Sequence, residues 1–204
     1  TLAAYSKGQK DLFQGLAMEQ LETEWVEHPV LHLDLNAKPF TKLQDLYALL
    51  NDQITIYEHR YGSVAVDESP GGRLRQLIRA AKEKTGRNVV VLVDEYDKPL
   101  LQAIGNEDLQ NEFRNALKAF YGVLKSADAD IRFALLTGVS KFSKVSVFSD
   151  LNNLMDISMS PHYYDICGIS ERELHDTFDN EVGELASVND QTKEEAYETL
   201  RQRY

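Results

Sequence analysis

The chain has 204 residues, of which 43% are hydrophobic, so it can bury a sizeable core in one large domain or in one domain with a small appendage. Its net charge of −11 argues against non-specific binding of duplex nucleic acid by this segment, because neutralising phosphates requires clustered Lys and Arg. The single cysteine, Cys167, cannot form an internal disulfide. No apolar run approaches the roughly 18 residues of a membrane span and no signal segment opens the sequence, so we expect no membrane partner and a cytoplasmic location.

The first sixty residues predict two helices with a short strand between them. Residues 10–25 have the pattern of an amphipathic helix, and residues 30–35 predict a strand with Asp34 near its exit. The capping-box pattern of residues 41–44 predicts the start of a second helix, which ends near Gly62. Asp34 has two interpretations, a ligand of a metal site or a surface carboxylate at a helix entry, and the second is the simpler.

Residues 63–72 are rich in Gly, Pro, Asp and Ser, and they predict a flexible surface loop between two helices. The helix that follows has a buried stripe and a basic face. A solvated helix face explains the basic residues more simply than a nucleic-acid site does. These residues are Arg73, Arg75, Arg79, Lys82, Lys84 and Arg87.

Residues 89–93 are an unbroken run of valine and leucine that ends at two adjacent carboxylates, Asp94 and Glu95. Such a run predicts a strand buried on both faces, and α/β folds place their chemistry at the carboxyl ends of such strands. The pattern is that of a Walker B element, in which Asp94 would hold Mg²⁺ and Glu95 would polarise the attacking water. A solvated strand end is the alternative. Asp97 is interpreted equally well as a helix cap or as part of the metal site.

A helix and a second apolar strand follow the two acids. Apolar residues between Leu109 and Leu124 recur at three- and four-residue steps, and Asn106 is placed to cap this helix. Residues 131–136 then predict a buried strand that leads into Thr137. Strand, helix and strand form a βαβ unit, whose crossover makes the two strands parallel. We therefore expect Asp94, Glu95 and Thr137 to share one crevice.

Three further polar residues complete the predicted site. Thr137 occupies the position of the residue that senses the terminal phosphate in phosphate-hydrolysing enzymes of this architecture, often called sensor 1. Lys141 and Lys144 follow it and either reach a phosphate or neutralise an acidic rim. The rim is favoured for Lys144, and both roles stay open for Lys141, which we take as the candidate cofactor-binding residue.

Five segments together resemble the bacterial AAA-ATPase-like family of predicted P-loop ATPases. The similarity covers almost the whole chain. In that family the domain is often followed by a PD-(D/E)xK nuclease-like domain, and the phosphate-binding loop normally precedes the first of these segments. The segments are HPVLHLDLN (28–36), VVVLVDEYDKPLL (89–101), FRNALKAFYGVLKS (113–126), IRFALLTGVSKFSKVSVFSDLNNL (131–154) and ICGISEREL (166–174).

The phosphate-binding loop itself is missing, because no G-x-x-x-x-G-K-[ST] occurs among the 204 residues. The resemblance implies that the sequence begins just after this Walker A element, inside the helix that follows it, and is a fragment of a longer protein. We expect an α/β fold with a parallel-sheet, P-loop-like core over residues 1–168. Capping boxes at 170–173 and 192–195 predict the start of a helical, lid-like subdomain over residues 169–204.

The leading functional interpretation is an ATP-hydrolysing P-loop domain that uses ATP and Mg²⁺ in the longer protein and regulates a nuclease-like domain of the same chain. This fragment alone is expected to be inactive. The alternative is a non-catalytic, nucleotide-regulated interaction module. A metal-dependent nuclease is disfavoured, because Glu95-Tyr96-Asp97-Lys98 lacks the acid-x-Lys spacing. The sequence does not determine the oligomeric state or the cellular target.

Overall fold

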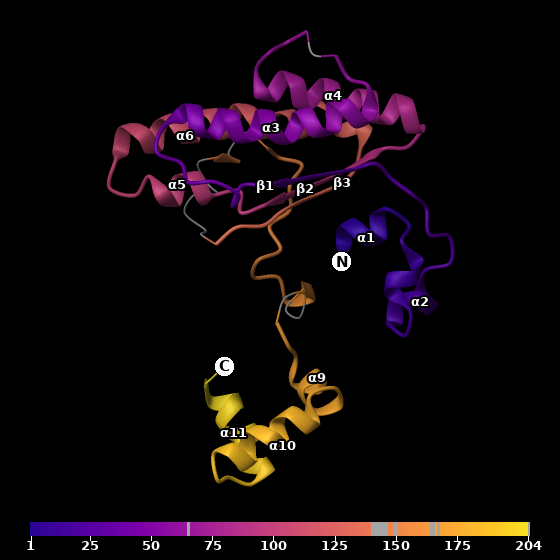
Figure 1. The fold of residues 1–204 in the computed structure, drawn as a ribbon, viewed down its shortest axis with the longest axis vertical. Coiled ribbons are helices and arrows are strands. Elements are labelled where there is room, and N and C mark those ends of the chain that lie inside the picture. Colours follow the sequence, from indigo (N-terminus) through magenta and orange to yellow (C-terminus); the bar gives the residue numbers. More distant parts are fainter. Residues whose placement is uncertain (65, 140–146, 149–150, 164–165, 167, 204) are drawn as a thin grey trace. The chain divides into compact units, whose positions relative to one another are not determined.

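The structure is a computed structural model that describes residues 1–64, 66–139, 147–148, 151–163, 166 and 168–203. The chain divides into two compact units, Thr1–Asn153 and Leu154–Tyr204, which are described separately below. Figure 1 shows the elements of both units. The assignment of residues 1–168 to a core and 169–204 to a lid stays a prediction.

A three-stranded parallel sheet lies at the centre of the first unit. Its strands are β1 (Val30–Asp34), β2 (Val89–Asp94) and β3 (Ile131–Leu136), and they lie in the order β1-β2-β3. Asp34 pairs with Asp94 across β1 and β2, and Val93 pairs with Leu136 across β2 and β3. The predicted α/β class and the predicted parallel neighbours β2 and β3 are confirmed. All three strands therefore finish at the same end of the sheet, which we call its carboxyl edge.

Three long helices cover one face of this sheet, namely α3 (Leu43–Tyr61), α4 (Pro70–Thr85) and α6 (Glu107–Tyr121) (Figure 1). Alternate strand residues turn toward them, because successive side chains of a strand point to opposite faces. The shorter α5 (Lys98–Gln102), α7 (Val123–Ser126) and η2 (Asp128–Asp130) complete the β2–β3 crossover. The core between sheet and helices includes Leu31, Leu33, Val91, Leu46, Leu50, Ile54, Leu74, Leu77, Ile78, Phe113, Leu117 and Phe120, all at most 2% exposed.

The opposite face of the sheet is covered less completely. Val30, Val90 and Leu92 form a small cluster there, and Ala3 of the short helix α1 (Leu2–Ser6) packs against it. Phe133 of β3 is 46% exposed. This face can therefore accept further covering structure.

The predicted helix over residues 10–25 is wrong. Two short pieces replace it, η1 (Lys10–Phe13) and α2 (Ala17–Leu21). Gly15 has a φ of 79° and Trp25 a φ of 46°, values that a right-handed helix does not accommodate. The rings of Tyr5, Phe13 and Trp25 pack against one another, with centroids 5.1 to 6.3 Å apart, so tertiary packing prevails over the helical pattern.

Side chains of α3 occupy the outer edge of β1. The Gln53 side chain accepts a hydrogen bond from the Asp34 amide at 2.8 Å and donates one to the Asp34 carbonyl at 2.6 Å. The Tyr57 hydroxyl accepts from the His32 amide at 2.9 Å and donates to the His32 carbonyl at 3.0 Å. These side chains take the place of a neighbouring strand. In the described part of the chain β3 pairs with β2 alone, so its outer edge differs from that of β1.

The helix ends follow local capping chemistry, with two corrections. Asn106 accepts from the Leu109 amide, as predicted for α6. Helix α4 begins at Pro70 with Ser69 as its cap, so residues 70–72 belong to a helix and not to the predicted loop. At the start of α3 the Asp45 carboxylate, and not Gln44, accepts the hydrogen bonds of the preceding amides.

The second unit contains η3 (Pro161–Tyr163), α9 (Glu171–Asp176), α10 (Asp179–Val188) and α11 (Lys193–Arg203). Both predicted capping boxes are present, Ser170 with Glu173 and Thr192 with Glu195. Its small core consists of Val182, Ala186 and Ala196, with Leu174, Tyr197 and Leu200 against them. Across both units, no helix of the described residues has the length and apolar character to cross a membrane.

Candidate functional site at the carboxyl ends of β2 and β3

Asp94 and Thr137 meet at the shared edge of the sheet. Asp94 is the last residue of β2, and Thr137 directly follows β3. The Thr137 hydroxyl donates a 2.5 Å hydrogen bond to Asp94 Oδ1. Backbone bonds from Thr137 N to the Val93 carbonyl and from Tyr96 N to the Thr137 carbonyl, both 2.9 Å, extend the pairing beyond the strands. The proximity of Asp94 and Thr137 expected from the βαβ pattern is therefore observed.

Glu95 has a left-handed backbone conformation, with a φ of 53°. Non-glycine residues adopt this region rarely, and such strain clusters at functional sites. The conformation places the Glu95 amide 3.1 Å from Asp94 Oδ1, to which it donates. Its carboxylate lies 3.5 Å from Lys98 Nζ, and both side chains are less than one third exposed. Glu95 thus borders the Asp94–Thr137 contact while its charge is partly balanced by Lys98.

Asp97 is fully buried, with an exposed fraction of 0%. It stands at the N-cap position of α5, but its side chain makes no cap hydrogen bond there. Oδ1 instead accepts a 3.2 Å hydrogen bond from the amide of Val139, in the loop after β3. The Asp97 side chain therefore does not cap α5, and its part in a metal site stays a prediction.

Aromatic rings pack against one another next to the β2–α5 turn. The Tyr96 and Phe148 ring centroids are 4.9 Å apart, and those of Tyr121 and Phe148 are 5.5 Å apart. The Tyr121 hydroxyl points to the Tyr96 carbonyl at 3.5 Å. Burial, together with the nearby Tyr96 and Asp97, raises the pKa of Tyr121 well above its ordinary value. Tyr121 is therefore a neutral, packed support for the β2–α5 turn.

The other residues that the sequence suggested for the site are Asp34, Lys141 and Lys144. Asp34 lies opposite Asp94 in the strand register, but its Oδ1 accepts from the Asn36 amide, the usual arrangement of a turn. Lys141, Lys144 and Cys167 lie outside the described residues. No group of three or more His, Cys, Asp or Glu side chains suited to a metal ion occurs in the described ranges. Among the described residues, a cation at this edge would therefore find few carboxylate or imidazole ligands.

Asp94 fits such a role. One of its carboxylate oxygens is engaged by Thr137 and Glu95, and the residue is exposed at the sheet edge. Mg²⁺ typically keeps several waters and is bound through one or two carboxylates plus substrate phosphates. A single, oriented carboxylate next to a hydroxyl suits that coordination. Asp94 and Thr137 alone would provide too few ligands for a metal site built entirely from protein groups.

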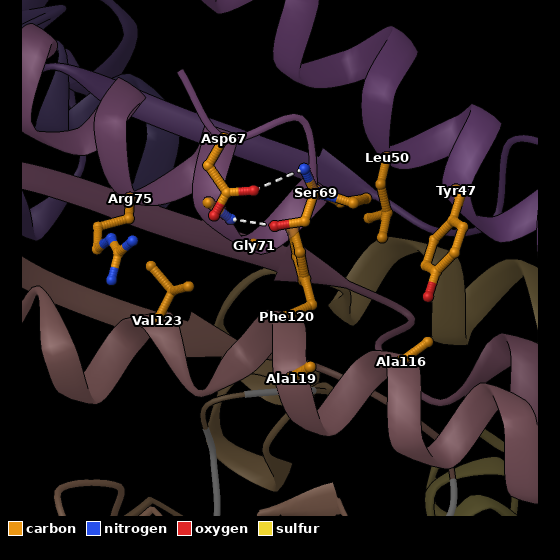
Figure 2. A pocket seen from close by; sticks show the side chains of 12 residues that line it. Tyr47, Leu50, Asp67, Ser69, Gly71, Arg75, Ala116, Ala119, Phe120 and Val123 are labelled. Carbon is orange, nitrogen blue, oxygen red and sulfur yellow. Dashed lines mark hydrogen bonds between the residues drawn. The ribbon is translucent and has the colours of Figure 1, made fainter. Parts of the chain in front are cut away.

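A pocket of about 240 Å³ lies elsewhere in the first unit, among α3, α4 and α6. Figure 2 shows Ser69 and Asp67 at its rim, with Tyr47, Phe120 and Val123 around it. The Asp67 carboxylate accepts a hydrogen bond from the Ser69 amide and lies close to Gly72. A carboxylate of the chain itself therefore occupies the N-terminal end of α4. None of Asp94, Glu95 and Thr137 lines this pocket.

The fold and the site define the class of protein. It is an α/β protein with a small parallel sheet that carries carboxylates and a hydroxyl at its carboxyl edge, consistent with a P-loop-like core. Residues 1–148 match the family model described as Predicted AAA-ATPase. The chain belongs to this AAA-ATPase-like family.

Two curated proteins resemble the chain. An "Uncharacterized protein in vnfD 5'region" from Azotobacter chroococcum mcd 1 is 40% identical over 183 residues, which are 89% of this chain and 35% of that protein. The mitochondrial phosphatidate cytidylyltransferase of Xenopus laevis is 34% identical over 92 residues, which are 41% of this chain and 26% of that protein. The chain thus spans about a third or less of the length of these relatives. No solved structure matches it.

Proposed function

We propose that this chain is part of an ATP-binding and ATP-hydrolysing P-loop domain. The observation that carries the proposal is the 2.5 Å hydrogen bond between Thr137 and Asp94, which brings a hydroxyl and a carboxylate from neighbouring strands to the edge where α/β folds bind ligands. Family membership supports the use of nucleotide and Mg²⁺. Regulation of a nuclease-like domain in the same longer chain is part of the proposal and rests on the family resemblance alone.

Each residue at the edge has a distinct role in this proposal. Mg-ATP supplies the reactive phosphate and the charge that polarises it. Asp94 anchors the metal through its water shell, and Glu95 orients the attacking water and accepts its proton. Thr137 contacts the terminal phosphate while its hydrogen bond keeps it in register with Asp94. Lys141, four residues after Thr137, would add a cation for the phosphates.

In this proposal the phosphate cradle is supplied by a segment outside these 204 residues, which contain no Walker A motif. Two features support a place for the missing strand beside β3. Gln53 and Tyr57 occupy the outer edge of β1, whereas β3 pairs with β2 alone among the described residues. The partly exposed Phe133 lies on the sheet face that the short helix α1 covers only in part, so this face has room for a further element.

The second candidate function is a non-catalytic, nucleotide-regulated interaction module. The ion pair between Glu95 and Lys98 favours it, because the lysine contacts the carboxylate that would otherwise face the attacking water. In the catalytic proposal this ion pair must open, or the lysine must move, when nucleotide binds. The two candidates therefore differ in whether the protein hydrolyses ATP with the Glu95 carboxylate as the base.

The test uses the longer protein with its upstream loop. Glu95→Gln is expected to leave Mg-ATP binding nearly intact and to lower turnover about 10²-fold or more, whereas Asp94→Ala weakens Mg-ATP binding as well. Glu112→Gln, at an exposed position of α6, is the matched control and should behave as wild type. Equal turnover of wild type and Glu95→Gln at saturating ATP would overturn the catalytic proposal and favour the interaction module.

A further inference from the structure

Asp97 is the one buried carboxylate among the described residues, and the proposed chemistry does not use it. Placing a carboxylate in the interior is costly unless hydrogen bonds compensate for the lost water. Asp97 Oδ1 accepts from the Val139 amide, 42 positions further along the chain. The energetic cost of burying this group is thus offset in part by a contact with the loop that follows β3.

Gly138 shows how closely this loop lies against Asp97. A Cβ atom added to Gly138 would lie 2.6 Å from Asp97 Oδ1 and 2.5 Å from Cε1 of Tyr96. Real side chains do not make carbon contacts this short, so only glycine allows the loop its present position. The fit is steric, because Gly138 is not among the glycines with positive φ.

The loop over residues 137–139 is consequently attached at two points, one at the end of β2 and one in the β2–α5 turn. At its start, Thr137 bonds to the Val93 carbonyl through its amide and to Asp94 through its hydroxyl. At its end, Val139 bonds to Asp97. The second attachment restricts the direction in which the chain leaves Thr137. It therefore bears on where the Thr137 hydroxyl can lie.

We infer that Asp97 is a positioning residue: its buried carboxylate holds residues 137–139 against the β2–α5 turn and thereby keeps the Thr137 hydroxyl on Asp94. This inference rests on the proposed function only for its consequence in catalysis. The positioning itself is a property of the 204-residue chain and can be measured without nucleotide. Asp97 would not contact substrate, because it is fully buried beneath the loop.

The first experiment measures amide hydrogen exchange by NMR in the 204-residue chain. Asp97→Leu keeps a side chain branched at Cγ, although a bulkier one, and removes the acceptor oxygens, so it should speed exchange of the Val139 amide about tenfold or more relative to the amides of β1. Asp97→Asn keeps an acceptor oxygen and should restore most of the protection. Leu77→Ala, in the core under α4, is the control: it should speed exchange across the whole sheet without singling out Val139.

Gly138→Ala provides an independent variant if Asp97→Leu does not fold. The added methyl would meet Asp97 Oδ1 and should displace the loop, so it too should expose the Val139 amide selectively. Unchanged exchange at Val139 in the folded variants would overturn the inference. A uniform rise that matches Leu77→Ala would also overturn it, because Asp97 would then contribute only to general stability.

The second experiment measures ATP turnover in the longer protein. Asp97→Leu should lower kcat about tenfold or more with KM changed less than about twofold, and Asp97→Asn should recover most of kcat. An equal loss in Asp97→Asn and Asp97→Leu would contradict positioning through the acceptor oxygen. If the wild-type protein hydrolyses no ATP, the proposed function fails, while the exchange experiment still decides the structural role of Asp97.

Discussion

The hydroxyl of Thr137 donates to Oδ1 of Asp94 at 2.5 Å although 43 positions separate the two residues in the chain. The contact exists because a helical crossover returns the chain parallel to β2, so both strands end at the same edge. It joins the two elements on which the proposed ATPase chemistry depends. Its disruption should therefore affect turnover more than folding.

Replacing Thr137 tests this expectation in the longer protein. Thr137→Val removes the hydroxyl at nearly constant volume and should lower kcat about tenfold, while Thr137→Ser keeps the hydrogen bond and should retain most activity. Steady-state ATP hydrolysis at saturating Mg-ATP distinguishes the two. Similar rates for Val and Ser variants would mean that the hydroxyl has no part in the reaction.

The isolated 204-residue chain should bind Mg-ATP poorly. Asp94 and Glu95 alone provide no row of amide donors for the phosphates, and the sequence contains no Walker A motif. Isothermal titration calorimetry with Mg-ATP is the direct measurement. Micromolar binding would contradict the prediction and would point to a phosphate site within the chain itself.

The side chains at the edge of β1 should contribute measurably to stability. Gln53→Ala removes two hydrogen bonds to Asp34 and should cost about 1 kcal/mol of the free energy of unfolding, with water replacing part of the loss at this exposed edge. Gln44→Ala is the matched control, an exposed glutamine on the same helix. Urea unfolding compares them, and equal midpoints would show that the edge contact is energetically neutral.

Arg73 links α4 to α3 through its guanidinium. It donates to both carboxylate oxygens of Glu58 and to Asn51 and Thr55, and the Arg73 and Glu58 side chains are only 15% and 13% exposed. Arg73→Met should cost about 2 to 3 kcal/mol, because it leaves a largely buried carboxylate without its partner. Arg79→Met, which breaks the exposed pair with Glu83, should cost less than about 1 kcal/mol. Comparable losses would contradict the role of burial.

Acid should weaken the helices of the second unit. Arg201 lowers the pKa of Glu171, and Lys193 with Tyr197 lowers the pKa of Asp179. A carboxyl with a lowered folded-state pKa stabilises above its unfolded pKa, and this stabilisation is lost as pH falls through the folded value. The loss should thus begin below about pH 4, near the ordinary carboxyl range.

NMR signals of Val182 and Ala186 in the 204-residue chain, followed through an acid titration, measure this change in the unit's core. Asp179→Asn should flatten the pH dependence by removing one of the titrating groups. Glu184→Gln, at an exposed position of α10, is the control and should leave the titration as in wild type. Helices that gain stability as pH falls would contradict the sign of the effect.

Local sequence patterns alone determined many of the strands, helices and helix starts of this protein. The apolar run of residues 89–93 predicts β2, the three- and four-residue periodicity predicts α6, and Asn106 and Ser170 predict helix starts. These signals suffice because strand burial, helix amphipathicity and capping depend on residues close in sequence. The meeting of Asp94 with Thr137 was also predictable, since the handedness of a βαβ unit leaves one parallel arrangement.

Other features were decided only by tertiary structure. The burial of Asp97 under Gly138 and the occupation of the β1 edge by Gln53 both depend on partners distant in sequence. The broken helix near Trp25 has the same origin, because aromatic packing outweighs a helical propensity of a few tenths of a kcal/mol per residue. Local sequence records the propensity of a segment, but the free energy of a buried contact exists only once the fold has brought its two sides together.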